Sequence, residues 1–194
     1  MRALAFTGAA AAVLAVLVLD GAAGQLFAIH MVQHLLLIAV AAPLLAAGTR
    51  FSPPPVTAWI AFVATFLFWH WPAAFQWAAG NAFNTVFELA SILMTAFVFW
   101  SAAFAAGRLS HGARALLVMT AAVATDLPGV VMLFAPRAIC VMPGENAPAF
   151  GLTPLEDQQL AGLLMWVPAN LVFFAIATWL FARWMSSPRN LVTS

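Results

Sequence analysis

Residues 25–47 read QLFAIHMVQHLLLIAVAAPLLAA, a run that is apolar except for two glutamines and two histidines. About 20 such residues in a helix cross the hydrocarbon core of a bilayer. The rest of the chain has the same character, because 65% of the 194 residues are hydrophobic and 7% are charged. Soluble domains carry about 25% charged residues, so this composition excludes a water-soluble monomer and a disordered chain. The sequence predicts an all-α, polytopic integral membrane protein.

Five further apolar runs flank this one, each bounded by polar, Gly or Pro residues. Together they predict a single transmembrane domain over residues 1–194, a helical bundle whose six spans cover residues 3–19, 25–47, 56–78, 82–106, 114–135 and 156–185. The first run also fits the apolar core of a secretory signal peptide. Cleavage of residues 1–24 therefore stays open as an alternative.

The arginines predict how the bundle lies in the membrane. With the N-terminus inside, six arginines fall on the cytoplasmic side and only Arg137 falls on the outer side. Cytoplasmic segments carry an excess of Lys and Arg, so we expect an N-in, C-in orientation. The net charge of +1, with no basic run, argues against nucleic acid as a partner.

Ionisable residues inside the predicted spans are costly and usually face the bundle interior. At 1.5 Å per residue, five of them that lie away from the span ends fall roughly 8–14 Å below the outer end of their span. They are His30, His34, His70, Glu88 and Asp126. Because four different spans place an ionisable group at one depth, we expect these side chains to meet in one site facing the outer side.

His30 and His34 are four residues apart, so their imidazoles project from one face of a helix. This spacing allows two nitrogens to bind one metal ion, and His70 could supply a third. Imidazole suits copper, zinc, iron and nickel. We predict these three histidines as metal ligands. The alternative is that they form hydrogen bonds between helices and only hold the bundle together.

Other residues are expected to tune this site or to add a ligand. Carboxylates often orient ligating histidines, which favours that role for Glu88 and Asp126. On the last span, Gln158 and Met165 share one helical stripe. In the outer loop, Cys140 and Met142 form a Cys-x-Met pair that could hold Cu(I) transiently or simply pack. The chain has no hydrolytic or nucleotide-binding motif, so we do not expect an enzyme.

Three segments carry a family resemblance: HMVQHLLL at 30–37 with APLL at 42–45, WHWP at 69–72, and DQQLAGLLMWVP at 157–168. They resemble the multi-spanning CtaG family of bacterial cytochrome c oxidase assembly factors. The resemblance implies a role in oxidase maturation linked to copper delivery, in the bacterial inner (plasma) membrane. It implies oxidase subunits or other assembly factors as partners. It also implies His30, His34, His70 and Asp157 as site residues.

These observations predict an outward-facing copper site within the membrane that assists maturation of the oxidase metal centre. One alternative is a haem-binding electron carrier, in which His34 and His70 would clamp the haem iron. Another is a metal-free membrane scaffold. A transporter is disfavoured, because the inner half of the predicted spans holds few polar residues.

Overall fold

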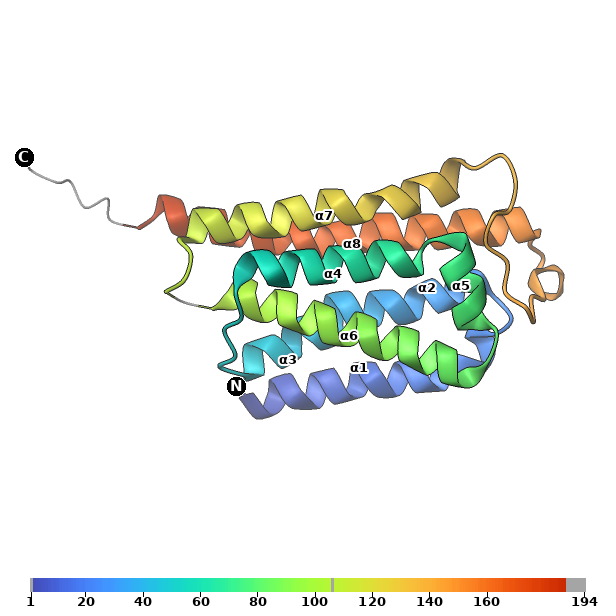
Figure 1. Ribbon diagram of the computed structural model, residues 1–194, viewed down its shortest axis with the longest axis horizontal. Helices are drawn as coiled ribbons and strands as arrows, with labels where there is room; N and C mark the ends of the chain where they lie inside the picture. The colour runs from blue at the N-terminus through green and yellow to red at the C-terminus, as the bar shows by residue number, and fades with distance from the viewer. Residues whose placement is uncertain (1, 106, 188–194) are drawn as a thin grey trace, which may run out of the picture.

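The computed structural model describes residues 2–105 and 107–187, and every regular element within them is a helix. The long helices run side by side, and α1 begins and α8 ends at the same end of the bundle (Figure 1). The helices are α1 (Arg2–Ala23), α2 (Phe27–Leu35), α3 (Ala42–Gly48), α4 (Pro55–Trp69), α5 (Pro72–Ala79), α6 (Ala82–Phe104), α7 (His111–Phe134) and α8 (Pro154–Met185), with a π-helical segment η1 (Leu36–Ala41) and a 3-10 turn η2 (Ala147–Phe150).

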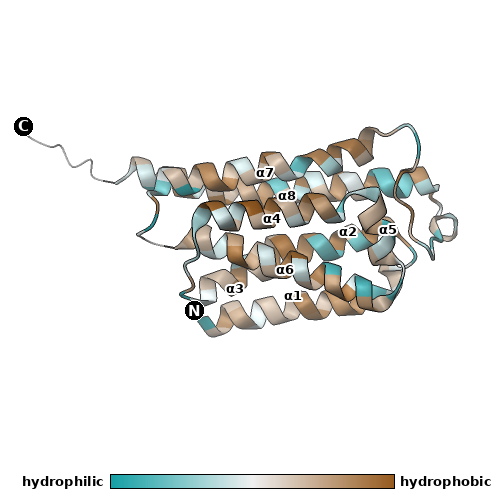
Figure 2. Ribbon diagram, viewed as in Figure 1, coloured by the Kyte–Doolittle hydropathy of each residue, from teal (hydrophilic) through white to brown (hydrophobic). Residues whose placement is uncertain are grey.

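The helices have the length and composition of membrane spans. Within residues 2–105 and 107–187, five helical segments are long and apolar enough to cross a membrane, and the bent pair α4–α5 makes six if it counts as one span. Hydrophobic residues cover most of the length of the helices, while hydrophilic ones lie mainly at the bundle ends and at a few positions within it, among them on α2 and α7 (Figure 2). Large apolar side chains such as Leu4, Val18 and Phe83 are at least 75% exposed, as lipid-facing residues are. The predicted polytopic all-α bundle is confirmed.

The third span differs from its prediction as one continuous helix over 56–78. Helix α4 ends at Trp69, α5 begins at Pro72, and the two are bent by 76°. Proline disfavours helical backbone in the residue before it, and Trp71 accordingly has extended backbone (φ −73°, ψ 130°). The bend places His70 at a corner inside the bundle instead of on a straight helix.

The second span is a continuous helix from Phe27 to Gly48, but its middle is π-helical. In a π-helix a carbonyl accepts from the residue five positions on, and for Ile38 that residue is Pro43, which has no N–H. The Trp100 indole instead donates to the Ile38 carbonyl oxygen at 2.8 Å, in a buried hydrogen bond. The π-helical turn begins two residues after His34, and such turns are frequent at functional sites.

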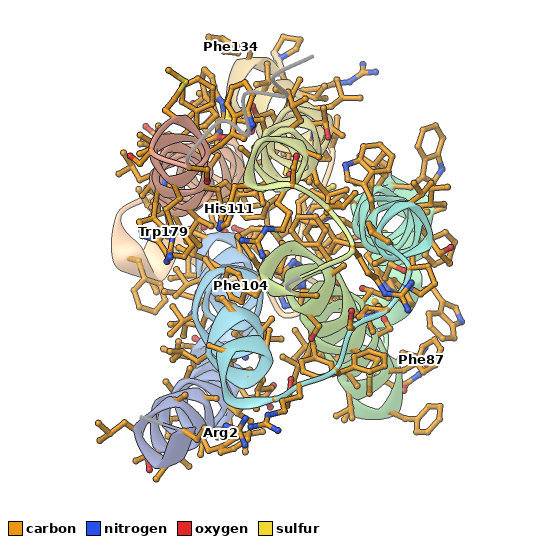
Figure 3. The ribbon with its side chains drawn as sticks, turned by 90° about the vertical axis from the view of Figure 1, so that its left-hand side faces the viewer. Arg2, Phe87, Phe104, His111, Phe134 and Trp179 are labelled. Carbon is orange, nitrogen blue, oxygen red and sulfur yellow. The ribbon has the colours of Figure 1, made fainter. Side chains whose placement is uncertain are left out.

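Helix α1 lies at the edge of the bundle, beside the helix that carries the histidines (Figure 3). Its buried face is made of small residues, Ala9, Ala12 and Val16. One polar contact joins the two helices inside the membrane, because Gln33 Nε2 donates to the Val16 carbonyl oxygen at 2.9 Å. Whether residues 1–24 are cleaved stays a prediction.

The loop over residues 135–153 covers the end of the bundle opposite the start of α1 and the end of α8, which is called the outer end here because the arginine distribution predicts that it faces outward (Figure 1). Side chains of the helices hold this loop, since Gln76 Nε2 donates to the Val141 carbonyl at 2.9 Å. The backbone N–H of Asn146 donates to the Gln25 carbonyl, also at 2.9 Å. Cys140 and Met142 are both buried, at 1% and 7% exposure.

Cys140 is expected to react slowly with alkylating reagents. Burial raises the pKa of its thiol to about 11. Since the thiolate is the reactive form, only about 0.1% of the thiol is reactive at pH 8, against about a quarter of an ordinary cysteine. Iodoacetamide should therefore label the folded protein at least roughly 100-fold more slowly than the SDS-unfolded chain. A Cys140→Ala/Phe150→Cys variant, with an exposed thiol in the same loop, should label quickly; equally rapid labelling of Cys140 would contradict the prediction.

Candidate metal centre

Helices α2 and α6 bring two imidazoles and a carboxylate together. His30 Nε2 and His34 Nε2 each lie 3.3 Å from the same oxygen, Glu88 Oε1. The helical repeat puts both histidines on one face of α2, and their ring centroids are 4.6 Å apart. One possible ligand atom from each of the three residues lies within 4.8 Å of the others. Glu88, expected as a supporting carboxylate, therefore stands between the two histidines with the geometry of a potential ligand.

His70 lies beside this group, at the corner between α4 and α5, but its ring nitrogens are not among the ligand atoms that lie within 4.8 Å of one another. Its ring centroid is 5.3 Å from that of His34. Its Nδ1 lies 2.6 Å from the Phe66 carbonyl oxygen, which can only accept, so Nδ1 carries the proton. In the neutral ring the lone pair is then on Nε2. Histidines that bind metals commonly donate their other N–H to a backbone carbonyl in this way.

Polar atoms without partners gather at this site. Four of them lack a hydrogen-bond partner within residues 2–105 and 107–187, namely His30 Nδ1, His34 Nδ1, His70 Nε2 and Glu88 Oε2, whereas the Nε2 atoms of His30 and His34 face Glu88 Oε1. None of the four residues is more than 7% exposed. A buried polar atom without a partner is costly and calls for a specific explanation. Two imidazole nitrogens and a carboxylate oxygen close together are a set of ligand atoms that fits a bound cation. The residues present can therefore hold a metal ion.

Asp157 supports the helix that carries the histidines. Its Oδ2 accepts from the backbone N–H of Phe27 at 2.7 Å, and its Oδ1 accepts from that of Ala28 at 3.0 Å. These are the first two residues of α2, whose N–H groups have no partner within the helix. The carboxylate, which the family resemblance implies as a site residue, is thus occupied by backbone donors, and it fixes the helix two residues before His30.

Removing the Asp157 carboxylate is expected to lower stability. Asp157→Ala leaves two buried N–H groups without an acceptor and should reduce the free energy of unfolding by roughly 2–4 kcal/mol. Asp157→Asn keeps one acceptor oxygen and should lose about half as much. Thermal unfolding in detergent measures both, with Glu145→Gln in the outer loop as the control. Equal stability of Asp157→Ala and the parent protein would contradict the assigned role.

Gln158 holds the outer loop. Its Oε1 accepts from the backbone N–H groups of Ile139 and Cys140, while its Nε2 donates to the Met132 carbonyl at 3.1 Å. The amide therefore ties the loop to the end of α7. Its three hydrogen bonds run to backbone groups and not to the imidazoles, which differs from the tuning role expected for it.

Asp126 pairs with a residue that the sequence argument missed. Asn170 Nδ2 on α8 donates to Asp126 Oδ1 at 2.6 Å. Both residues, with Met165, line a cavity of about 30 Å³ that also touches His34. This volume suits a single water molecule. Because Asp126 and His34 both line the cavity, Asp126 faces the histidine site across it. Asn170 is the only asparagine in the predicted span 156–185, and a lone amide in an apolar run could have indicated such a partner.

An aromatic layer closes the site on the side away from the outer loop. The rings of Phe62 and Phe99 stack at 4.9 Å, and those of Trp100 and Phe173 lie 4.9 Å apart. All four side chains are at most 2% exposed. The site therefore has an apolar floor, and its outward orientation stays a prediction.

Comparison with known proteins gives one match. The model of the cytochrome c oxidase caa3 assembly factor family (Caa3_CtaG) matches residues 48–187. No curated protein and no solved structure matches the chain. The matched range contains His70, Glu88 and Asp157 and begins after His34. It covers most of the 194 residues and confirms the family resemblance, so the chain belongs to the cytochrome c oxidase caa3 assembly factor family.

Proposed function

We propose that this protein binds one copper ion, as Cu(I), between α2, α6 and the corner after α4. In this role it assists metal-centre maturation of a cytochrome c oxidase in the bacterial inner membrane. His30 and His34 are the primary ligands and His70 is the third. The observation that carries the proposal is that two buried imidazole nitrogens, His30 Nε2 and His34 Nε2, lie 3.3 Å from one carboxylate oxygen of Glu88, among further buried polar atoms without partners in the described part of the chain. The family membership supports the oxidase as the target.

Charge favours Cu(I) over a divalent ion at this site. Neutral imidazoles supply the donor atoms that copper accepts, and Glu88 supplies the negative charge. A single positive charge beside one buried carboxylate leaves the site neutral, whereas a divalent ion leaves a net charge in a region of low dielectric. Glu88 is 0% exposed, so water contributes little to balancing that charge.

The role is that of a non-enzymatic assembly factor. Its partners are the oxidase subunits or other assembly factors, which it meets within the membrane. Haem is disfavoured as the ligand because the His34 imidazole packs edge-to-face against both His30 and His70. This packing leaves no room for a macrocycle between the rings.

The experiment is metal analysis and absorption spectroscopy of the detergent-purified chain after loading with Cu(I). About one copper per chain is expected, lost in His30→Ala/His34→Ala and retained in His111→Ala at the opposite end of the bundle. In cells, the double variant should fail to support oxidase activity. A Soret band would assign the histidines to haem. If the parent protein bound neither metal nor haem after loading, the result would favour a metal-free membrane scaffold.

A further inference from the structure

A second cavity reaches the histidine site from the outer end of the bundle. It has a volume of about 310 Å³ and lies between α1, α2, the start of α6 and the outer loop. We call it the outer vestibule. Its inner wall includes His30 and Gln33, and its outer wall includes Asp20, Ala82 and Met142.

The polar atoms of the outer vestibule form a series from its rim to His30. Asp20 is exposed at the end of α1, where the carbonyl groups of the helix add negative potential. Deeper groups are Gln33 Oε1 and His30 Nδ1, which belong to residues at most 1% exposed and have no hydrogen-bond partner in the part of the chain that the structure describes. Met142, a residue that is 7% exposed, lies in the outer wall.

These groups suit a soft cation of single charge. A carboxylate attracts it at the rim, and a thioether and an imidazole are donors that Cu(I) accepts. Two other polar residues of the lining are already engaged, because Asn81 caps α6 through the Asn84 N–H and the Thr85 hydroxyl donates to the Ala78 carbonyl. The free polar atoms are therefore those that a moving cation would meet.

A competing opening leads to His70 from the side of the bundle. This groove of about 640 Å³ lies between the α4–α5 corner and α7 and is lined mainly by apolar residues, including Leu67, Val131 and Ile139. A cation entering there would have to cross hydrocarbon, which is costly for any charged group. The outer vestibule offers a polar approach from the aqueous side instead.

We infer that the outer vestibule is the entry route by which Cu(I) reaches His30, with Asp20 and Met142 as its guiding groups. The inference rests on the proposed function, since it names the path to the same site. It also gives the two residues of the Cys140–Met142 pair different roles, because Met142 lines the route and Cys140 does not. Residues of the route govern the rate of loading, whereas His30 and His34 govern its equilibrium.

The test is stopped-flow loading of the purified full chain with Cu(I) released from a weak chelator, alongside equilibrium titration. Ala82→Trp fills the outer vestibule and should slow loading by about 10-fold or more, with Kd changed by less than about 2-fold. Ala73→Trp, a matched alanine in the groove beside His70, should load at the parent rate. Met142→Leu should also slow loading.

Asp20→Asn tests the electrostatic role directly, because a purely structural effect would not change how the loading rate depends on ionic strength. Attraction to a rim carboxylate is screened by salt, so this variant should load more slowly and with a smaller dependence on ionic strength. Slowing by Ala73→Trp and not by Ala82→Trp would overturn the route, as would parent rates in all the vestibule variants. A parent protein that binds no Cu(I) at equilibrium would overturn the proposed function itself, and the route with it.

Discussion

Replacing Glu88 by Gln is expected to weaken Cu(I) binding by roughly 100-fold to several thousand-fold, the equivalent of about 3–5 kcal/mol for removing one charge from a buried pair. Glutamine keeps the size of the side chain and one acceptor oxygen, so the packing between α2 and α6 should persist. What disappears is the negative charge 3.3 Å from two imidazole nitrogens. Without it, the bound cation has no counter-charge in a region of low dielectric.

The measurement is competition titration against a Cu(I) chelator of known affinity. Glu145→Gln, which removes one acid from the outer loop, controls for the change in overall charge and should bind like the parent. Thermal unfolding shows whether the variant remains folded. Parent-like affinity in a folded Glu88→Gln variant would contradict the charge argument and point to the imidazoles alone as the binding site.

Gly162→Ala is expected to be the most destabilising single-methyl change in the bundle, at about 3 kcal/mol. A Cβ atom at Gly162 would lie 2.6 Å from the Gly129 carbonyl oxygen and 2.9 Å from the Leu133 nitrogen. Both neighbours are backbone atoms of α7, so a rotamer change cannot relieve the contact. Helices α7 and α8 would have to separate, and with them the Asp126–Asn170 pair and the anchoring of the outer loop by Gln158.

A second glycine provides a matched control, for which the expected change in the free energy of unfolding has the opposite sign. Gly21 lies within α1, and a Cβ there would meet nothing within 4 Å. Gly21→Ala should therefore stabilise slightly, by about 0.5–1 kcal/mol, because alanine loses less conformational freedom in a helix. Unfolding of both variants in the same detergent gives the comparison. Similar stability of the two would mean that the α7–α8 crossing tolerates a wider separation than the contacts indicate.

The supporting residues around the site were the least predictable from the sequence. Acids at the start of α8 resemble ordinary partners of their own helix, yet Asp157 accepts from the first turn of α2. Gln158 and Met165 share a stripe, but Gln158 bonds the outer loop while Met165 lines the small cavity beside His34. Each of these contacts joins residues far apart in the chain, and no local pattern encodes such a pairing.

Pro72 indicated the break in the third span, but the hydropathy of this stretch favoured one continuous helix. Pro72 disfavours helical backbone at Trp71, but the apolar run continues through both residues and predicts one span over 56–78. The structure shows a 76° bend there. Because of that bend, His70 lies 5.3 Å from His34, measured between ring centroids.

The sequence by itself determined the all-α membrane bundle, its apolar runs and the pairing of His30 with His34. Hydrocarbon admits only structures that satisfy their own backbone, and the helical repeat is a local property. Only the tertiary structure decided that Glu88 stands between these histidines, that Asp157 supports α2 and that Asp126 pairs with Asn170. Those contacts depend on which helices are neighbours and how each is rotated. For α7 and α8, Gly129 and Gly162 allow the close approach that brings these two helices together, and hydropathy does not predict it.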